Sequence, residues 1–290
     1  METGVMPQQF SSWTDSLMWR RQEWANLRAV VSAAIARGWD RHAWLVPLHL
    51  HGYLLIQPDH RREAVEMFEA VLGFGTAREQ MILQLKLASL YDDVGRRDDA
   101  LYSFETALPL AHVAEEPYAE AAGLINVSVL YRRLGRTDDM ANSLRRALSI
   151  AVKIGDRYLE AVCRLNLAGT WNLQGRHAEA LLDAELAVAA ASGLGDEYLT
   201  IRVHGMWAAT LANLGRYDEA LSELPSVVAE LQQFGDADAE AAMQESIGIA
   251  LAGLNRHEEA AAAWQRAERL WRDLGDEHAE RVAQRLAELG

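Results

Sequence analysis

Glycine recurs at a fixed interval along most of this 290-residue chain. Eleven positions from 75 to 275 lie twenty residues apart, and nine of them hold glycine. The two exceptions are Glu115 and Asn255. Because only 20 of the 290 residues are glycine, chance does not produce nine matches in eleven. A regular period of this kind predicts an array of structural repeats.

Helix termination explains why glycine fills these positions. Helices commonly end at a residue in the left-handed conformation, where glycine has no side-chain penalty and asparagine is the next best choice. Asn255 is therefore expected to keep the same mechanism. A step of twenty leaves about 17–18 helical residues between stops, roughly 26 Å of helix.

The stops alternate between two kinds, so the structural period is forty residues and each unit holds two antiparallel helices. One kind is Gly-Arg followed by acidic residues, at Gly95, Gly135, Gly175 and Gly215, with Asn255-Arg256 as a variant. The other kind is Gly-Asp, at Gly155, Gly195, Gly235 and Gly275. The aspartate after each of these glycines is expected to cap the next helix by accepting a backbone N–H bond.

Residues at fixed distances from the stops resemble the tetratricopeptide repeat family. The small-residue and aromatic positions of the first helix are filled by Leu87-Ala88…Tyr91, Val127-Ser128…Tyr131, Leu167-Ala168…Trp171, Trp207-Ala208…Leu211 and Ile247-Gly248…Leu251. The second-helix positions hold Ala100-Phe104-Ala107, Met140-Leu144-Ala147, Ala180-Ala184-Ala187, Ala220-Leu224-Val227 and Ala260-Trp264-Ala267. A degenerate first unit fits as Gly52…Leu55 and Ala64-Phe68-Val71.

Forty-residue units are similar to the long-helix repeats of kinesin light chains and of large bacterial transcription activators of the antibiotic-regulatory, STAND type. The resemblance implies an all-α, right-handed α-solenoid of six helix pairs, with an N-terminal helix and a C-terminal capping helix. It also implies that the first helix of each pair lines a concave groove in which partners bind.

The predicted organisation has four parts. Residues 1–12 are expected to be disordered, 13–37 to form one amphipathic helix, 38–276 to form the six-unit solenoid, and 277–290 to form the capping helix. The run from Glu23 to Val30 resembles the segment that opens the repeat domain of the activators, so the chain is either a stand-alone relative or an excised sensor domain. Pro47, Pro109 and Pro225 fall inside predicted helices, where local distortion is expected.

Composition argues against several classes of function. The formal net charge of −14 argues against a nucleic-acid-binding surface. No uncharged apolar run reaches the roughly 18 residues of a membrane helix, and we identify no secretory signal. The single cysteine, Cys163, fits a buried hydrophobe in a reducing cytoplasm. Motifs for catalysis, metal binding or cofactor binding are absent, so we predict no catalytic residue, no metal and no cofactor.

The candidate binding residues lie on the predicted first helices. Asn126 and Asn166 stand one place before the small-residue motif, where the resemblance implies an asparagine that holds a peptide backbone in the groove. The alternative is that each amide caps a loop or bridges two helices. Gly169 and Gly205 are expected to face the groove and admit a ligand, or else to allow close helix packing. The full predicted set is Lys86, Asn126, Arg133, Asn166, Gly169, Asn172, Arg202, Gly205, Asn213 and Glu245.

These observations predict a non-catalytic recognition module that binds a peptide, a protein segment or a small effector in the groove. The resemblance places that role in bacterial transcriptional regulation, in the cytoplasm. Two alternatives remain: an assembly scaffold that joins two proteins without sensing, and, more remotely, an enzyme with a pocket inside the solenoid. An exposed subset of the N-terminal tryptophans would mark a homodimer or domain contact.

Overall fold

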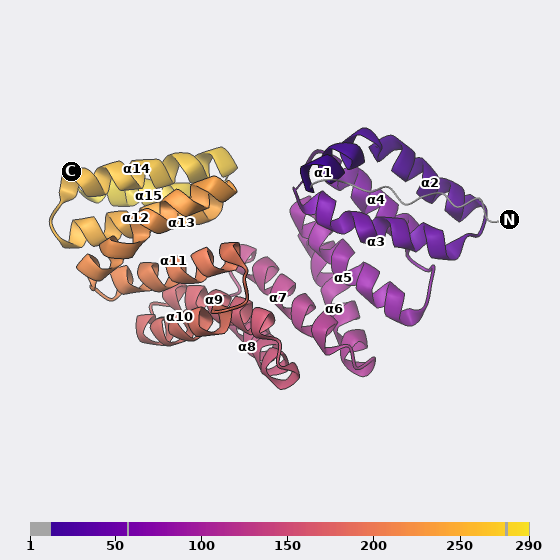
Figure 1. The fold of residues 1–290 in the computed structure, drawn as a ribbon, viewed down its shortest axis with the longest axis horizontal. Coiled ribbons are helices and arrows are strands. Elements are labelled where there is room, and N and C mark those ends of the chain that lie inside the picture. Colours follow the sequence, from indigo (N-terminus) through magenta and orange to yellow (C-terminus); the bar gives the residue numbers. More distant parts are fainter. Residues whose placement is uncertain (1–12, 57, 276–277, 290) are drawn as a thin grey trace. The chain divides into compact units, whose positions relative to one another are not determined.

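The computed structural model describes residues 13–56, 58–275 and 278–289, and these residues are almost entirely helical (Figure 1). They form fifteen α-helices and one short 3₁₀-helix, with no strand among them. The all-α, repeat-based fold class predicted from the glycine period is confirmed. Residues 1–12 and Asp276, for which disorder and a capping role were predicted, lie outside the described residues.

The chain divides into two compact units, residues 1–130 and 131–290, with the boundary inside α7. The helices that lie within the first unit are α1 (Trp13–Gln22), α2 (Trp24–Ala36), α3 (Asp40–Ile56), α4 (Arg61–Val71), α5 (Ala77–Asp93) and α6 (Arg97–Val113); α7 spans Pro117–Arg133. The second unit holds α8 (Thr137–Ile154), α9 (Arg157–Leu173), α10 (His177–Ala191), α11 (Glu197–Asn213), α12 (Tyr217–Phe234), α13 (Ala237–Gly253), α14 (His257–Leu274) and α15 (His278–Glu288). Six successive helix pairs, from α3/α4 to α13/α14, match the six predicted repeats, and α15 packs on α14 as the expected cap.

Each helix stop on the twenty-residue grid has a left-handed backbone. At Gly175, with φ of 71°, the N–H of the glycine donates to the carbonyl of Asn172 over 3.1 Å. The N–H of Arg176 donates to the carbonyl of Trp171 over 2.8 Å. These two bonds form the Schellman motif, which satisfies carbonyl groups that the helix end would otherwise leave without partners.

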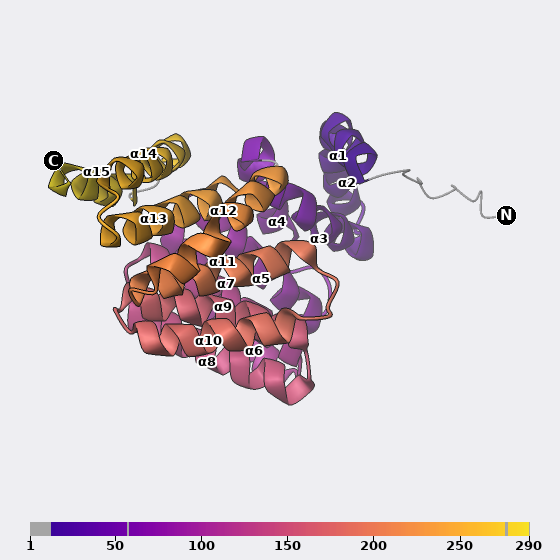
Figure 2. The same ribbon diagram turned by 60° about the vertical axis from the view of Figure 1, so that its left-hand side comes forward.

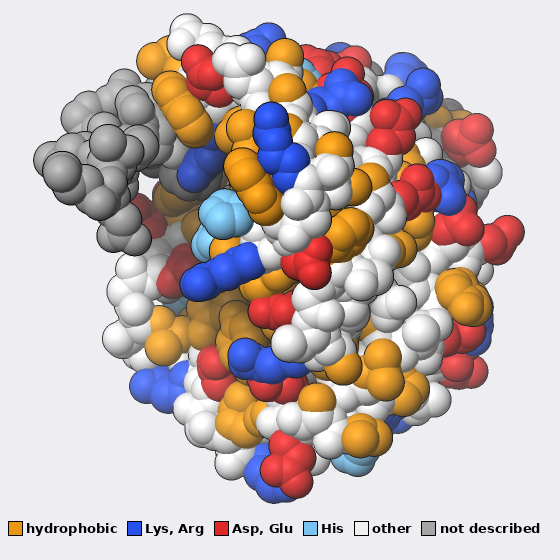
Figure 3. Space-filling view, turned by 90° about the vertical axis from the view of Figure 1, so that its right-hand side faces the viewer, with side chains coloured by type: hydrophobic (Ala, Val, Ile, Leu, Met, Phe, Trp, Pro, Cys, Tyr) orange, Lys and Arg blue, Asp and Glu red, His pale blue; other side chains and the backbone are white. Residues whose placement is uncertain are grey.

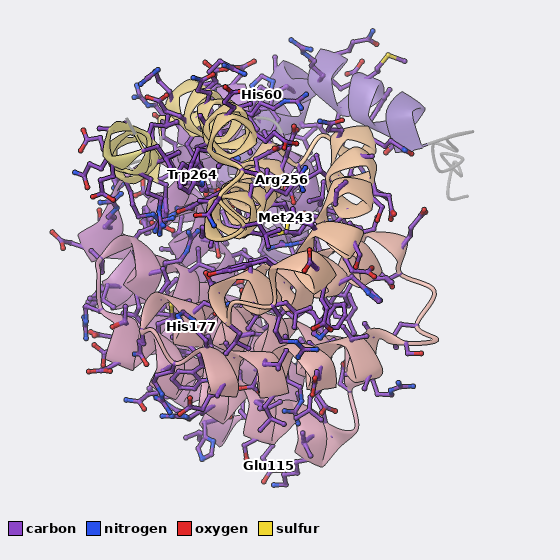
Figure 4. The ribbon with its side chains drawn as sticks, turned by 90° about the vertical axis from the view of Figure 1, so that its left-hand side faces the viewer. His60, Glu115, His177, Met243, Arg256 and Trp264 are labelled. Carbon is purple, nitrogen blue, oxygen red and sulfur yellow. The ribbon has the colours of Figure 1, made fainter. Side chains whose placement is uncertain are left out.

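The two grid positions without glycine have the same backbone conformation. Asn255 has φ of 61°, which confirms the prediction that asparagine keeps the stop. Glu115 has φ of 53°, although a glutamate side chain disfavours that region. Figure 4 labels Glu115 just beyond the end of α6. The repeat geometry therefore imposes the turn even where the residue type opposes it.

Nine of the helices that precede a grid position end within two residues of it, whereas α4 and α10 end four residues early. In both exceptions a second glycine, Gly73 or Gly193, precedes the grid glycine by two residues and also has a positive φ. The additional positive-φ glycine, two residues before the grid glycine, starts the turn sooner.

Three other sequence predictions can be compared with the helix boundaries. The single helix predicted over 13–37 is wrong, because it is interrupted at Glu23 between α1 and α2. The helices that contain Pro47, Pro109 and Pro225 all continue past the proline, so none of these residues ends its helix. Asp156, Asp196 and Asp236 each accept a backbone N–H bond at the start of the next helix, as predicted.

At three of the four Gly-Arg stops, the arginine contacts both the helix that ends there and the helix that begins there. The guanidinium of Arg176 lies 4.3 Å from the ring centroid of Trp171, near the end of α9, and bonds Glu179 in the first turn of α10. Arg96 and Arg136 make the same pair of contacts with a tyrosine and an aspartate. An exposed ion pair contributes about 0–1 kcal/mol to stability, and a cation–π contact about 0.5–1 kcal/mol. Each contact alone is therefore weak, and the stabilisation adds up because the contact is repeated.

Small side chains allow the paired helices to approach closely. Ala168 on α9 and Ala180 and Ala184 on α10 are fully buried. The equivalent residues Ala208, Ala220 and Leu224 are also fully buried in the next pair. The helices of the second unit lie side by side in Figure 2, and this alanine-rich core joins each helix to its neighbour. The positions that carry the tetratricopeptide resemblance are thus core positions.

We predict that Gly175→Val lowers the free energy of unfolding by about 1–3 kcal/mol, because a β-branched residue is strained in the left-handed region. A side chain at Gly175 would meet no atom within 4 Å, so this substitution tests backbone conformation alone. Gly175→Asn is the control and is expected to lose much less, as Asn255 shows that the stop accepts asparagine. Urea melts measure both, and equal midpoints for wild type and the valine variant would contradict the prediction.

We also predict that Glu115→Gly stabilises the protein. The left-handed conformation costs a non-glycine residue about 1–2 kcal/mol, and the greater freedom of glycine in the unfolded chain offsets about 0.5–1 kcal/mol of that gain. Glu105→Gly is the matched control, since Glu105 is exposed in the middle of α6 and should lose about 1 kcal/mol. A thermal melt in which both substitutions destabilise would show that Glu115 is not strained.

Candidate functional site

The first helices of the second unit form the closer-packed of its two layers. Helix α11 packs against both α9 and α13, whereas the successive second helices α10, α12 and α14 make few contacts with one another. An array curves toward the side on which its helices are closer together. Within residues 131–290, the layer of α9, α11 and α13 is therefore the inner layer, as the tetratricopeptide resemblance implied.

A stripe of half-buried residues follows this layer. On α9 it includes Val162, Asn166 and Gly169, and on α11 it includes Arg202, Met206 and Asn213. The spacings of three, four and seven residues place each set on one face of its helix. The two helices meet along the stripe, since a side chain at Gly169 would lie 3.4 Å from the Cε atom of Met206. The stripe thus brings together four of the ten predicted binding residues: Asn166, Gly169, Arg202 and Asn213.

Asn166 keeps part of its hydrogen-bonding capacity. Its Nδ2 atom donates to the backbone carbonyl of Val162 over 3.0 Å, within the same helix. Its Oδ1 atom accepts no hydrogen bond from the part of the chain that the structure describes. The half-buried amide therefore offers one acceptor and one N–H group to a ligand.

Asn172 has the other role that was considered for asparagine, because its amide is engaged by neighbouring helices. Nδ2 donates to Oγ1 of Thr210 on α11 over 2.8 Å, and it lies 3.7 Å from the sulfur of Met206. Oδ1 lies 3.1 Å from Nδ1 of His177 at the start of α10. The predicted ligand contact of Asn172 is replaced by a bridge across three helices. The sequence did not single out Thr210 and His177, which complete this bridge.

The two predicted groove glycines differ in their surroundings. A side chain at Gly205 would lie 2.9 Å from Sδ of Met243 and 3.0 Å from Cγ1 of Val227, which are on α13 and α12. Gly205 is buried, so its assignment to the groove is wrong and close helix packing explains it. Gly169 has only the ordinary contact with Met206, and it is the one of the two that remains a candidate.

Glu245 is also not an open groove residue. Its carboxylate is buried at the junction of α13 and α15, with Oε2 2.7 Å from Nη2 of Arg281 and Oε1 3.3 Å from Nε of Arg285. The prediction of Glu245 as a direct ligand contact is corrected, since two arginines already occupy its oxygens. The two arginines lie four residues apart, which places them on one face of the last helix, and this spacing is visible in the sequence.

The remaining candidates lie outside the α9–α11 stripe. In the first unit, Lys86 on α5 is half-buried, and its burial lowers the pKa of the ammonium group; Asn126 on α7 is exposed. Arg133 ends α7 in the second unit and is exposed. The role of each of these residues stays a prediction.

Nothing in the described residues points to catalysis. Cys163 is fully buried, and burial raises the pKa of its thiol to about 12, so the thiolate nucleophile does not form near neutral pH. In the described part of the chain, no three side chains of the types that bind metals cluster together. None of the described helices is long and apolar enough to cross a membrane.

Acidic and basic side chains are interspersed with apolar ones on the face shown in Figure 3. Of the N-terminal tryptophans, Trp24 is buried and stacks on His60, whereas Trp39 is 53% exposed beside Arg37. Trp39 is the kind of exposed aromatic residue that a contact with another chain or domain would use.

Solved structures share this arrangement of helices. A signal transduction ATPase of the STAND type with a tetratricopeptide repeat sensor, from Pyrococcus horikoshii, matches 94% of this chain and 46% of its own, with a TM-score of 0.64 and 12% identity. The fold is that of the tetratricopeptide repeat proteins. The apo quorum sensor NprR from B. thuringiensis matches 96% of this chain and 81% of its own, at 15% identity and a TM-score of 0.62. A Rap protein complexed with competence and sporulation factor matches 95% and 83%, at 12% identity and a TM-score of 0.61. The sequence matches no protein-family model and no curated protein.

The two inner-layer glycines yield a paired prediction. Alanine is about 1 kcal/mol better than glycine inside a helix, so Gly169→Ala should leave stability unchanged or raise it by up to about that amount. Gly205→Ala should lose on the order of 1 kcal/mol, because overpacking costs about 1–3 kcal/mol. Urea melts at one protein concentration measure both variants. An alanine at Gly205 that is tolerated as well as one at Gly169 would contradict the packing role.

Proposed function

We propose that this chain is a non-catalytic recognition module that binds a peptide or protein segment along the first helices of its repeats. The observation that carries the proposal is the stripe on α9 and α11, where half-buried polar and apolar side chains alternate on the inner layer. Asn166 retains hydrogen-bonding groups there, near Gly169 and the flexible side chain of Met206. Binding sites typically combine apolar lining with a few fixed polar groups in this way.

The spacing of the repeats suits an extended peptide. Neighbouring packed helices lie about 8–10 Å apart, and three extended residues span about that distance. An asparagine amide can pair with a peptide backbone through one donor and one acceptor, as a neighbouring strand does. A contact of this kind at every third peptide residue recognises the peptide backbone, so binding would depend little on the side chains of the peptide.

The structural neighbours support a role in sensing. The STAND protein is described by its tetratricopeptide repeat sensor, NprR as a quorum sensor, and the Rap protein by its complex with competence and sporulation factor. By analogy, occupancy of the groove would be passed to a partner domain or protein. We place this sensing role in transcriptional regulation in a bacterial cytoplasm.

A peptide-display selection against the full chain tests the proposal. Peptides are selected on immobilised protein and then measured by fluorescence anisotropy. A binding peptide should perturb the NMR signals of residues on α9 and α11. Selected peptides that perturb only the outer helices α8, α10 and α12 would refute the assignment of the site.

Asn166 gives a quantitative prediction. Asn166→Ala should lower affinity for a selected peptide about two- to tenfold, because a lost hydrogen bond contributes about 0.5–1.5 kcal/mol. Stability should change little, since the Asn166 side chain bonds only within its own helix.

Asn142→Ala is the matched control, because Asn142 is an exposed asparagine on the second helix α8. It should bind within about twofold of wild type. Equal affinities for wild type, the control and Asn166→Ala would show that Asn166 does not contact the ligand.

A further inference from the structure

The last two helices of the second unit carry an unbalanced charge cluster. Glu245 on α13 is in contact with both Arg281 and Arg285 on α15, at 2.7 and 3.3 Å. Within the cluster itself, two guanidinium groups face one carboxylate, so positive charges exceed negative ones by one. The exposed Glu280 and Glu288 are the other carboxylates of α15. The Glu245 side chain is 9% exposed, whereas those of Arg281 and Arg285 are 41% and 40% exposed. The excess positive charge therefore faces solvent, above a buried negative charge.

The cluster is held in place from both sides. The indole Nε1 of Trp264 on α14, labelled in Figure 4, donates to the backbone carbonyl of Glu245 over 3.0 Å. On α15, Ala279 and Val282 are buried against the same core as Trp264. Because both helices are fixed, the two guanidinium groups are positioned before any ligand arrives, which lowers the entropy that binding costs.

The arginines also retain hydrogen-bond donors. A guanidinium group has five N–H groups in a planar fork that matches a carboxylate. Arg281 gives one of its N–H groups to Glu245, and its Nε atom is buried and meets no acceptor within the described residues, so a ligand would use the remaining Nη groups. Holding α15 in place requires only one ion pair. The second arginine places two like charges near each other, which a further anion would relieve.

We propose that Arg281 and Arg285 bind a carboxylate group of a ligand, with Glu245 as the positioning residue that holds them. A carboxylate carries one negative charge, which balances the excess of the cluster. A phosphate dianion would leave a net negative charge next to the buried Glu245. The inference rests on the proposed function, since the carboxylate belongs to a peptide, either at its C-terminus or on an acidic side chain.

The experiment uses the full chain with ¹⁵N-labelled arginine and three short probes, followed through the Nε–H NMR signals. The probes are acetyl-trialanine with a free C-terminus, the same peptide as an amide, and acetyl-Ala-Glu-Ala amide. Signals are assigned with Arg281→Gln and Arg285→Gln. Arg269→Gln is the control, because Arg269 is an exposed arginine on the neighbouring helix α14.

The proposal expects saturable shifts of the Arg281 and Arg285 signals with at least one of the acidic probes, and none with the neutral amide. The probe that binds identifies a C-terminal or a side-chain carboxylate as the source. Arg285→Gln should weaken binding at least about fivefold, as expected for loss of a charge-assisted hydrogen bond, while Arg269→Gln leaves it unchanged. Circular dichroism confirms that each variant is folded, and Arg285→Lys should recover part of the binding because it keeps the charge.

Three results would overturn the proposal: no saturable shift with either acid, equal shifts with the neutral amide, or equal shifts at Arg269. These probes do not depend on Asn126 or Asn166. If the NMR titration fails but the display selection yields a peptide that binds α9 and α11, the carboxylate site is refuted and the proposed function stands. If the acidic probes bind Arg281 and Arg285 but no selected peptide binds α9 and α11, the carboxylate site stands and the proposed function is refuted.

Discussion

The left-handed stop at the end of each helix is the constraint on which the rest of the structure depends. An α-helix leaves its last four carbonyl groups without partners, and the Schellman turn satisfies two of them while reversing the chain. This turn recurs at most of the stops on the twenty-residue grid, as at Gly175, and it sets the length of the helices that end there. The requirement is strong enough that Glu115 adopts the same conformation despite its side chain. Antiparallel pairs of nearly equal helices follow directly.

Contacts around each stop then join one helix to the next. Where the preceding helix has an aromatic ring near its end, the arginine after the glycine lies on that ring and pairs with an acid in the following helix, as Arg176 does with Trp171 and Glu179. Individually these exposed contacts are weak. Their repetition, together with fully buried alanines such as Ala168 and Ala180, produces an array in which each unit depends mainly on its neighbours.

The same packing decides which surface residues are open to a ligand. Asn166 and Asn172 are on the same helix, yet the first bonds only within α9 while the second bridges to α10 and α11. The inner layer is therefore partly a structural interface and partly an exposed stripe. The Glu245 cluster shows the same division, since one carboxylate fixes α15 while the excess charge of its two arginines remains exposed.

The sequence by itself determined the six helix pairs, the repeat length and most helix ends, because these depend on the local backbone preferences of glycine, asparagine and aspartate. A second glycine near the stop changes the helix end. At Gly193 it ends α10 four residues before the grid position. Only the tertiary structure decided which side chains face a neighbour. Gly169 and Gly205 both lie inside the first helix of a repeat, and the sequence predicts the same role for both. Only Gly205 packs against Met243 and Val227 from other helices. Such contacts depend on the rotation and spacing of helices distant in sequence, which no local preference specifies.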